Sequence, residues 1–432
     1  MTSARGIARE VLERVEQGAH ANALLPEALR RTRLTDRDRA FATDLVYGTV
    51  RLQRALDHLL ATVSSRQLDT LDPPVRAALR LGAYQLVKGV PPHAAVGETV
   101  TVTPRSGAGF VNAVLRSLST VGPPWPWPEG DDPEAIGVRT SHPDWIVEAL
   151  VRDLGTADAL RVLDRDNSAP AVTLRINPRR TTVEALAAEL EGGGAHVERG
   201  LLVADSLVVR GIGDPRALPA VAQGRATPQD QGSQAVVAML APLAGERVLD
   251  VAAAPGGKAI AAAELMDDRG LVVAVDVHAG RAGLVRDAAR RVGVRSVVVA
   301  VADGRALPAV DSSFDRVLVD APCSGLGVLR RRPDARWRVQ PGDVEDLAIL
   351  QRELLAAAAR AVKPGGRLTF AVCTLTRAET LEVDAWAAEH LPDFTALAPP
   401  GAPWRPHGRG ALILPHDAGS DGMFVLSLER RA

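Results

Sequence analysis

The chain has only two cysteines, Cys323 and Cys373, and each stands at the end of an apolar run of strand length. Cys323 belongs to the string Asp320-Ala-Pro-Cys-Ser-Gly-Leu-Gly327, and Cys373 belongs to Phe370-Ala-Val-Cys-Thr374. A free cysteine is most often a small buried hydrophobe. If the two strands are neighbours in one sheet, however, they lie about 5 Å apart and both thiols reach one pocket. We therefore expect the two thiols to act in one site.

Four acidic residues are expected at the ends of four successive strands, namely Asp250, Asp276, Asp303 and Asp320. A single acid in such a place is more often an N-cap or a turn residue. Four together would gather at the carboxyl edge of a parallel sheet, where the ligands of open α/β sheets bind. Asp276 stands where a carboxylate commonly binds ribose hydroxyls. The pattern favours a cofactor of the nucleoside type.

A glycine-rich turn follows the first of these strands, in Val248-Leu-Asp-Val-Ala-Ala-Ala-Pro-Gly-Gly-Lys258. Such a turn at a helix N-terminus lets backbone N–H groups approach a ligand closely. The string matches neither the dinucleotide motif nor the P-loop, which argues against dinucleotide or ATP binding. Lys258 is one of only three lysines, with Lys88 and Lys363, in a chain whose other basic residues are arginine. We expect its compact charge to support the cofactor site.

Two thiols, an acid and a nucleoside cofactor suit the methylation of cytosine at C5. That carbon is too electron-poor to attack a methyl donor directly, but addition of a thiolate at C6 makes it nucleophilic. The C5 proton must then leave so that the thiol can be eliminated, which is covalent catalysis followed by general-base-assisted release. An acid near N3 would balance the charge as the adduct forms.

An α/β domain is predicted to hold these residues. Apolar runs of strand length occur at Arg247–Val251, Leu271–Val275, Ser296–Val301, Arg316–Val319 and Arg367–Val372. Helical segments lie between them near Lys258–Met266, Gly280–Val292 and Val344–Val362. Continuous apolar strands that alternate with helices form a parallel sheet buried on both faces. We predict this domain over residues 226–432, with two further strands near its end at Ala411–Leu414 and Met423–Leu428.

Three other segments precede that domain. Residues 1–120 carry apolar side chains at helical spacing throughout, which predicts an all-α bundle. Residues 121–138 include several prolines and two tryptophans, Trp125 and Trp127, which predicts a packed linker. Residues 139–225 combine a helix at Asp144–Leu154 with a strand at Val172–Ile176, so we predict a small α+β segment.

Charge and composition limit the function classes. Residues 1–120 carry 16 basic and 11 acidic side chains, which hints at a polyanionic partner, although a normally solvated helical surface explains it equally well. No apolar run reaches the ~18 residues of a membrane helix, and no signal peptide is apparent at the N-terminus. Two cysteines form neither a disulfide framework nor a four-cysteine zinc site. We expect a soluble, cytoplasmic protein without a metal.

These motifs resemble those of the bacterial Fmu/Sun (RsmB-type) ribosomal RNA cytosine-C5 methyltransferases, over nearly the whole chain. Asp250–Lys258 is similar to that family's cofactor motif, and Asp320–Gly327 to its Asp-Ala-Pro-Cys-Ser-Gly motif. Arg331–Trp337 continues the second motif. The flanking strings Gln229–Gln234 and Asp421–Arg430 are also similar. In the N-terminal region, Leu34–Gly48, Leu79–Gln85 and Phe110–Arg116 resemble a NusB-like RNA-binding domain.

The resemblance implies a NusB-like all-α domain, a small α+β segment and a Rossmann-like methyltransferase domain that uses S-adenosylmethionine. It implies Cys373 as the nucleophile, Cys323 as the cysteine that assists product release, and Asp320 as a third catalytic residue. The cofactor-binding positions that it implies are Ala252, Ala253, Ala254, Pro255, Gly256, Gly257, Lys258, Asp276, Asp303 and Asp320. Within that set, Asp276 would hold the ribose hydroxyls and Asp303 would lie near the adenine.

The sequence departs from the family pattern at three places. Ala252 replaces a non-catalytic cysteine of the cofactor loop, so that only packing is affected. Val372 and Thr374 flank the nucleophile where the family has threonine and serine, which changes the neighbours of the thiol. Ala259 removes a hydroxyl near the start of the helix after the loop. None of these changes abolishes the expected chemistry.

An arginine-rich run follows the second cysteine motif. Arg330, Arg331, Arg332 and Arg336 are expected to contact RNA phosphates, with Trp337 either stacking on a base or packing. A solvated loop anchored by a buried tryptophan is the simpler interpretation, and the two can coexist.

The combined hypothesis is S-adenosylmethionine-dependent methylation of cytosine C5 in small-subunit (16S) ribosomal RNA through a covalent Cys–C6 adduct. The expected partner is that RNA or its assembly intermediate, and the expected oligomeric state is a monomer. Two alternatives stay open: a tRNA cytosine-C5 methyltransferase, and a catalytically idle RNA-binding assembly factor.

Overall fold

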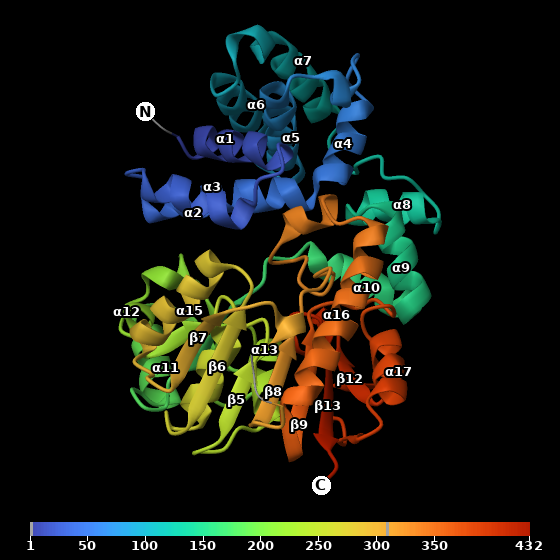
Figure 1. Cartoon of the computed structure of the whole chain (residues 1–432). Coiled ribbons are helices and arrows are strands. Elements are labelled where there is room, and N and C mark those ends of the chain that lie inside the picture. The colour runs from blue at the N-terminus through green and yellow to red at the C-terminus, as the bar shows by residue number, and fades with distance from the viewer. Residues whose placement is uncertain (1–2, 308–310) are drawn as a thin grey trace. The chain divides into compact units, whose positions relative to one another are not determined.

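The computed structural model describes residues 3–307 and 311–432. By its internal packing the chain forms two compact units, shown in Figure 1. The first, here called the helical unit, comprises Met1–Ala169 and Leu329–Val339. The second, here called the sheet unit, comprises Pro170–Val328 and Gln340–Ala432. The chain therefore leaves the sheet unit after Val328, contributes residues 329–339 to the helical unit, and returns to the sheet unit at Gln340.

Short amphipathic helices build the helical unit. They are α1 (Ala4–Glu16), α2 (Ala21–Arg30), α3 (Asp36–Arg51), α4 (Gln53–Ala61), α5 (Pro73–Val87), α6 (Pro92–Thr101), α7 (Arg105–Val121), α8 (Pro133–Thr140), α9 (Asp144–Leu154) and α10 (Thr156–Asp166), with the 3₁₀ turns Leu68–Thr70 and Pro333–Trp337. The helix starts follow local rules: Thr35 accepts a hydrogen bond from the amide of Asp38, and α5 begins with proline. Apolar residues three and four positions apart, such as Leu56, Leu59 and Leu60, are fully buried.

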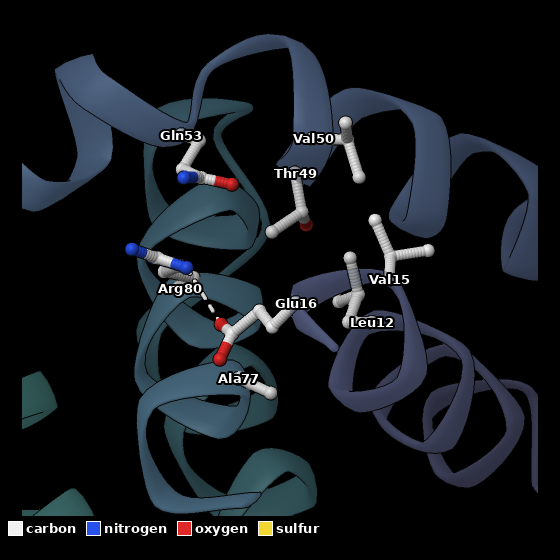
Figure 2. A pocket seen from close by; sticks show the side chains of 8 residues that line it. All are labelled: Leu12, Val15, Glu16, Thr49, Val50, Gln53, Ala77 and Arg80. Atoms are coloured by element: carbon white, nitrogen blue, oxygen red, sulfur yellow. Dashed lines mark hydrogen bonds and ion pairs between the residues drawn. The ribbon is translucent and has the colours of Figure 1, made fainter. Parts of the chain in front are cut away.

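Polar side chains in this bundle serve its stability. Glu16 accepts hydrogen bonds from Arg76 at 2.9 Å and from Arg80 at 2.6 Å, and Arg80 also binds Asp57 at 2.7 Å. Figure 2 shows Glu16 and Arg80 beside a cavity of about 10 Å³. That volume has room for about one water molecule. The cavity is thus too small for a substrate or a cofactor.

A small antiparallel sheet begins the sheet unit. Its strands, β1 (Val172–Ile176), β2 (His196–Arg199), β3 (Ser206–Arg210) and β4 (Ala226–Pro228), lie in the order β2-β3-β1-β4. The helices α11 (Val183–Gly192) and α12 (Pro219–Ala222) and the 3₁₀ turn Pro215–Ala217 complete it. Leu174, Leu186 and Leu207 form part of a separate core there. This is the α+β segment expected from the sequence.

A nine-stranded sheet follows. Its strands are β5 (Arg247–Asp250), β6 (Leu271–Asp276), β7 (Val297–Val301), β8 (Phe314–Asp320), β9 (Val362–Val372), β10 (Phe394–Ala396), β11 (Arg405–His407), β12 (Gly410–Ile413) and β13 (Met423–Arg430). The main order is β11-β12-β13-β9-β8-β5-β6-β7, and β10 pairs with β13. Strands β5 to β9 pair in parallel, whereas β13 runs antiparallel to β9.

Helices cover this sheet (Figure 1). They are α13 (Gln231–Leu240), α14 (Gly257–Leu265), α15 (Ala279–Val292), α16 (Pro341–Ala361), α17 (Leu381–His390) and α18 (Pro415–Ala418), with a 3₁₀ turn at Gly304–Ala306. Alternate strand residues such as Val248, Val272 and Leu318 share one core with α13, α14 and α15. Helix α16 contacts β8 and β9, and α17 packs against α16. Strands β5, β6, β8 and β9 are largely buried, which explains why they are almost uninterrupted hydrophobic runs. Strand β7 lies at the edge of the sheet, and its Val298 and Val301 are about half exposed, so the expected burial on both faces does not extend to it.

The three fold classes expected along the chain are confirmed. Helix α9 has the predicted bounds, and α9 and α10 belong to the helical unit. The last strands of the large sheet are antiparallel, so the sheet is mixed. Trp125 and Trp127 pack against the core of the bundle, as predicted. The division into four segments at 120, 138 and 225 stays a prediction.

Candidate active site

Five residues that the sequence singled out follow one another along the carboxyl edge of the large sheet. The parallel strands lie in the order β7-β6-β5-β8-β9 (Figure 1). Asp303 follows β7, Asp276 ends β6, Asp250 ends β5, Asp320 ends β8, and Cys373 follows β9. Because β8 and β9 pair in register, with Asp320 opposite Ala371, the loops that leave them start side by side. Along this edge, in the order from β7 to β9, the acids follow the strands β7, β6, β5 and β8, and the thiols lie in the loops after β8 and β9.

The two thiols are in contact. The Sγ atoms of Cys323 and Cys373 lie 3.2 Å apart, and both residues are partly exposed. The loop of Cys323 is fixed to that of Cys373 because the amide of Gly327 donates to the Cys373 carbonyl at 3.0 Å. The carbonyl of Gly327 in turn accepts from the amide of Gly422 at 2.8 Å. A substrate atom that reaches one thiol is thus within reach of the other.

The surroundings of Cys323 favour its protonated form. Its hydrogen bond with Cys373, its burial and the nearby charges of Glu379 and Asp320 raise the pKa of this thiol well above the ordinary value. A thiol that holds its proton can donate a hydrogen bond to a thiolate. Either sulfur can act as the donor in this contact, and the raised pKa of Cys323 favours the proton on Cys323.

Lys258 connects the thiols to the acids. Its Nζ lies 2.7 Å from Asp320 Oδ2 and 3.4 Å from Ser233 Oγ. Burial alone would lower the pKa of Lys258, but the charges of Asp320 and Cys373 outweigh it, and the pKa is raised. The ammonium therefore stays charged beside Asp320.

The loop Ala252–Gly257 leads from β5 to α14. The amide of Ala253 donates to the carbonyl of Val275 at 2.7 Å, which holds the loop against β6. Gly256 has φ of 104°, and a Cβ at this position would lie 3.0 Å from a methyl group of Val285. Glycine is needed there both for the left-handed backbone and for the close packing of α15. The loop is thus a rigid turn beside the acids.

Asp250 has an unusual environment. Only 1% of the residue is exposed, and the backbone of Ala252 is its one hydrogen-bonding neighbour among the described residues. Burial and the charge of Asp320 raise the pKa of Asp250 to about 7, against the opposing effects of Lys258 and of the Ala252 backbone. A buried acid with so few partners is costly, and a positively charged ligand would reduce that cost. S-adenosylmethionine carries a sulfonium and an ammonium group, and these positive charges fit the acids of this edge.

Asp276 and Asp303 complete the set of cofactor residues expected from the sequence. Asp276 is buried, and its Oδ1 accepts from the amide of His278 at 2.9 Å. Arg281 donates to the Ala254 carbonyl at 3.0 Å and approaches Asp276 to 3.9 Å. Asp303 caps the 3₁₀ turn after β7 and binds the guanidinium of Arg305 at 2.7 Å. Asp276 is thus held in place by the backbone, whereas Asp303 already has an exposed counter-ion.

Glu379 and Gln351 belong to this site but were not singled out in the sequence. Glu379 is fully buried and accepts from the side chains of Ser324 and Thr374, the residues that follow the two cysteines. Gln351 donates to Glu379 and to the Pro322 carbonyl. The only signal in the sequence is an acid among three threonines shortly after Cys373.

The expected phosphate contacts of the arginine run are not supported for two of its members. Arg330 and Arg336 are fully buried in the helical unit. Arg336 donates to the carbonyls of Arg51, Ser141 and Asp166 and to Asn167 Oδ1, at 2.9 to 3.2 Å. Because protein oxygens already accept its hydrogen bonds, this buried guanidinium has a structural role and is not available to a phosphate.

The other members of the run differ in exposure. Arg332 is exposed and Arg331 is half-buried, so the prediction of phosphate contact remains for these two. The indole of Trp337 donates to the Val50 carbonyl at 2.8 Å and packs against the core of the bundle, which favours packing over base stacking.

The described part of the chain contains neither a cluster of metal-binding side chains nor a membrane-spanning helix. Within residues 3–307 and 311–432, no three histidine, cysteine or acidic side chains are grouped so that they could hold a metal ion. No helix in the same ranges has the length and apolar character needed to cross a membrane.

Family models match three consecutive parts of the chain. The model described as 16S rRNA methyltransferase RsmB/F matches residues 237–429. The NusB family model matches residues 2–120, and a model described as the ferredoxin-like domain of RsmF/B-like methyltransferases matches residues 142–214. The three matches follow the order of the bundle, the small sheet and the large sheet.

Curated relatives and a solved structure align with the whole chain. The Bacillus subtilis protein named "Probable ribosomal RNA small subunit methyltransferase B" is 35% identical and covers 100% of this chain and 99% of its own. Ribosomal RNA small subunit methyltransferase B of Sodalis glossinidius is 34% identical, over 98% of this chain and 96% of its own. The crystal structure of PH0851 has a TM-score of 0.85 at 26% identity and covers 99% of both chains.

Proposed function

Because this chain belongs to the RsmB/F family of 16S rRNA methyltransferases, we propose that it methylates C5 of a cytosine in small-subunit ribosomal RNA through a covalent adduct with Cys373. The contact of 3.2 Å between the Sγ atoms of Cys323 and Cys373 carries this proposal. Methylation at C5 by way of C6 requires one thiol to add and a second group to assist elimination. A contacting pair of thiols provides both groups at one place.

Cys373 and Asp320 would act in the first half of the reaction. The thiolate of Cys373 attacks C6 and so raises the electron density at C5. Asp320 lies at the end of the adjacent strand, and as an acid it would balance charge at N3 as the adduct forms. S-adenosylmethionine, when bound, supplies the electrophilic methyl group. Lys258 holds Asp320 in place and keeps a positive charge close to Cys373.

Cys323 would act in the second half. The hydrogen bond to Cys373 is the largest cause of its raised pKa. Once the sulfur of Cys373 is bonded to C6, it no longer carries the charge that opposes ionisation of Cys323. Cys323 would then lose its proton to solvent, and its thiolate would take the C5 proton. The electron pair of the C5–H bond would form the C5–C6 double bond as the bond between Cys373 and C6 breaks, which releases the Cys373 thiolate.

The residues of the acid edge would bind the cofactor. The loop Ala252–Lys258 and the acids Asp276, Asp303 and Asp320 are the proposed contacts. Asp250 adds a buried carboxylate, with the Ala252 backbone as its one hydrogen-bonding neighbour among the described residues, in the same place. Positive charge on the cofactor would relieve the cost of burying this acid.

The RNA substrate separates this proposal from two alternatives. The NusB family match over residues 2–120 supports an RNA substrate, and the 16S rRNA methyltransferase RsmB/F match together with the names of the relatives supports ribosomal RNA. A tRNA substrate would keep the chemistry and change only the recognition. A catalytically idle assembly factor would bind RNA without transferring a methyl group, and the contacting thiols beside Asp320 argue against it.

Transfer of tritium from labelled S-adenosylmethionine tests the proposal. Deproteinised 16S RNA, assembled small subunits and tRNA are each incubated with the full chain, and 5-methylcytosine is identified after digestion. We expect label in one of the two ribosomal substrates and none with Cys373→Ala. Label in tRNA alone supports the first alternative. Binding of both RNA and cofactor without any label supports the second.

A further inference from the structure

A buried carboxylate joins the two cysteine-bearing loops. Glu379 lies between β9 and α17, and none of its surface is exposed. Its Oε1 accepts from the amide of Ser324 at 2.8 Å and from Nε2 of Gln351 at 3.0 Å. Its Oε2 accepts from the hydroxyls of Ser324, Thr374 and Thr376, at 2.5, 2.9 and 2.9 Å. All five donors are neutral groups.

The loop of Cys323 is held on both sides of the cysteine. Ser324, the next residue, gives Glu379 both its amide and its hydroxyl. Pro322, the preceding residue, accepts from Gln351 at 2.9 Å, and Gln351 is itself bound to Glu379. Since both peptide neighbours of Cys323 are fixed to one carboxylate and its amide partner, the position of the thiol depends on them.

The loop of Cys373 is bound to the same carboxylate. Thr374, the next residue, donates to Glu379, and its Oγ1 also lies 2.8 Å from Ser324 Oγ. Thr376, two residues further on, supplies another hydroxyl. One oxygen atom of Glu379 thus receives hydrogen bonds from the loops of both cysteines.

We propose that Glu379 is a positioning residue that holds Cys323 and Cys373 at reaction distance by accepting hydrogen bonds from Ser324 and Thr374. The part of this inference that concerns turnover rests on the proposed function. The part that concerns the distance between the thiols does not.

A carboxylate suits this position better than any other side chain of its size. It is an acceptor at about four lone pairs and donates nothing when ionised. Glutamine in its place would present an NH₂ group to hydroxyls or to an amide that now donate to an oxygen. The two N–H bonds of that group can serve at most two of the three hydroxyls that now donate to Oε2, and those hydroxyls would have to turn from donors into acceptors. The hydrogen bonds that link the two loops would therefore be rearranged. Alanine would leave every donor without its partner.

A role confined to general stability would predict something different. Glu264 is a buried glutamate of the same unit, and it binds Arg175 at 2.7 Å from helix α14. Replacement of Glu264 removes a buried carboxylate without touching either cysteine loop. Glu264→Gln is therefore the matched control for Glu379→Gln.

A trivalent arsenical measures the distance between the thiols without RNA or cofactor. Phenylarsine oxide reacts with two thiols to give a cyclic dithioarsenite and one water, and stable capture requires both sulfurs in one place. We expect the wild type and Glu264→Gln to capture the reagent equally. We expect Glu379→Gln to capture it at least about 10-fold more slowly, because a loop shift near 1 Å is costly at a site that needs two groups together. Cys323→Ala and Cys373→Ala give the background.

Turnover provides the second measurement. In the methylation assay, Glu379→Gln should lower kcat by about 10²-fold while the KM for RNA and the affinity for S-adenosylmethionine stay unchanged. Calorimetry with S-adenosylmethionine and a thermal melt also establish that the variant is folded. If it is not folded, Thr374→Val with Ser324→Ala replaces it, since these changes remove the two linking hydroxyls and leave the carboxylate.

The outcomes separate this inference from the proposed function. Slow arsenical capture by Glu379→Gln supports the positioning role, even if the wild type methylates none of the RNAs tested. Capture at the wild-type rate overturns it, as does an equal loss of capture in Glu264→Gln. If methylation is present and Glu379→Gln keeps the wild-type kcat, the positioning role in catalysis is also overturned.

Discussion

Cys323 and Cys373 are chemically alike, so any difference between their proposed roles has to come from their neighbours. Cys373 is close enough to Lys258 for its charge to raise the pKa of that ammonium. Cys323 lies close to the charges of Glu379 and Asp320, which disfavour its thiolate. Positive charge near one thiol and negative charge near the other support the proposal that Cys373 is the nucleophile.

The roles of the two cysteines can be tested separately. Cys373→Ala should abolish methylation and trap no RNA, because no adduct can form. Cys323→Ala should still add to C6 and transfer the methyl group, and then stall before elimination. The stalled species is a protein–RNA conjugate that survives denaturing electrophoresis and is absent in the double variant. A conjugate that accumulates in Cys373→Ala instead would mean that the two roles are exchanged.

Asp250 makes a second residue-level prediction, which concerns pH. Because burial raises its pKa to about 7, the folded protein keeps this proton at pH values where the unfolded chain has lost it. Between about pH 4 and pH 7 the unfolded state binds fewer protons than the folded state, so the free energy of unfolding falls as pH rises. Asp250→Asn lacks this effect. Relative to that variant, the wild type should lose roughly 3 kcal/mol between pH 5 and pH 8.

Denaturant unfolding of both proteins at the two pH values checks this result without cofactor. The groups shared by the two proteins cancel in the comparison. A difference in stability that does not change with pH would mean that Asp250 titrates near its ordinary value.

The sequence located the thiols and acids because chain order alone places strand ends at one edge of a parallel sheet. The same reasoning could not find Glu379. Its donors include Ser324 and Gln351, 55 and 28 residues away, and only the fold brings them together. Burial of Arg336 was missed for the same reason, because Arg51 is 285 residues away. Local patterns thus identify reactive groups better than the residues that hold them.

At the scale of elements, strongly periodic segments were predicted well and context-dependent ones poorly. Helix α9 and strand β1 have the predicted bounds. Strand β9 begins at Val362 instead of Arg367, because it pairs with β8 across a register shift between Phe314 and Arg316. Strands β2 and β4 were missed, since β2 is largely exposed and β4 has three residues. Short strands acquire their structure from their partners.

Gly327 tests how closely the elements of the site must approach. A Cβ at this position would lie 2.2 Å from the Gly422 carbonyl oxygen and 3.0 Å from that of Cys373. Gly327→Ala must therefore displace the loop that fixes both cysteines, and methyl transfer should fall by about 10²-fold. Gly342→Ala in α16 is the control, because nothing lies within 4 Å of its Cβ. Equal activity of the two variants would show that the loop adapts.

The segment Leu329–Val339 gives another prediction at this scale. Arg336→Ala would leave the carbonyls of Arg51, Ser141 and Asp166 without their donor, at a cost of about 3 kcal/mol. Amide hydrogen exchange in α3, α9 and α10 of the full chain should therefore become about 10²-fold faster. Exposed Arg332→Ala is the matched control and should leave exchange unchanged. Unchanged exchange in both variants would mean that this segment does not stabilise the helical unit.

The whole molecule combines an N-terminal part with excess positive charge and a remainder with excess negative charge. Residues 1–120 carry 16 basic and 11 acidic side chains, whereas the complete chain has a net charge of −1. Arg30, Arg33 and Arg37 lie near the end of α2 and the start of α3 and are exposed. The buried arginines of the bundle, such as Arg80, are instead engaged in ion pairs. The exposed arginines therefore place positive charge at the surface, whereas the buried ones stabilise the bundle.

If the helical unit binds RNA through phosphates, its exposed arginines should determine how binding depends on salt. Each phosphate contact releases counter-ions, so the logarithm of the binding constant falls linearly with the logarithm of salt concentration, by about 0.7 to 0.9 per contact. Combined replacement of Arg30, Arg33 and Arg37 by alanine should reduce the slope by about 2. Affinity for S-adenosylmethionine should stay the same, because the acid edge belongs to the sheet unit. Filter binding of 16S RNA by the full chain over a series of salt concentrations measures the slope, with exposed Arg210→Ala in β3 as the control. An unchanged slope in the triple variant would assign these arginines to an ordinary solvated surface and move the RNA-binding role to other residues.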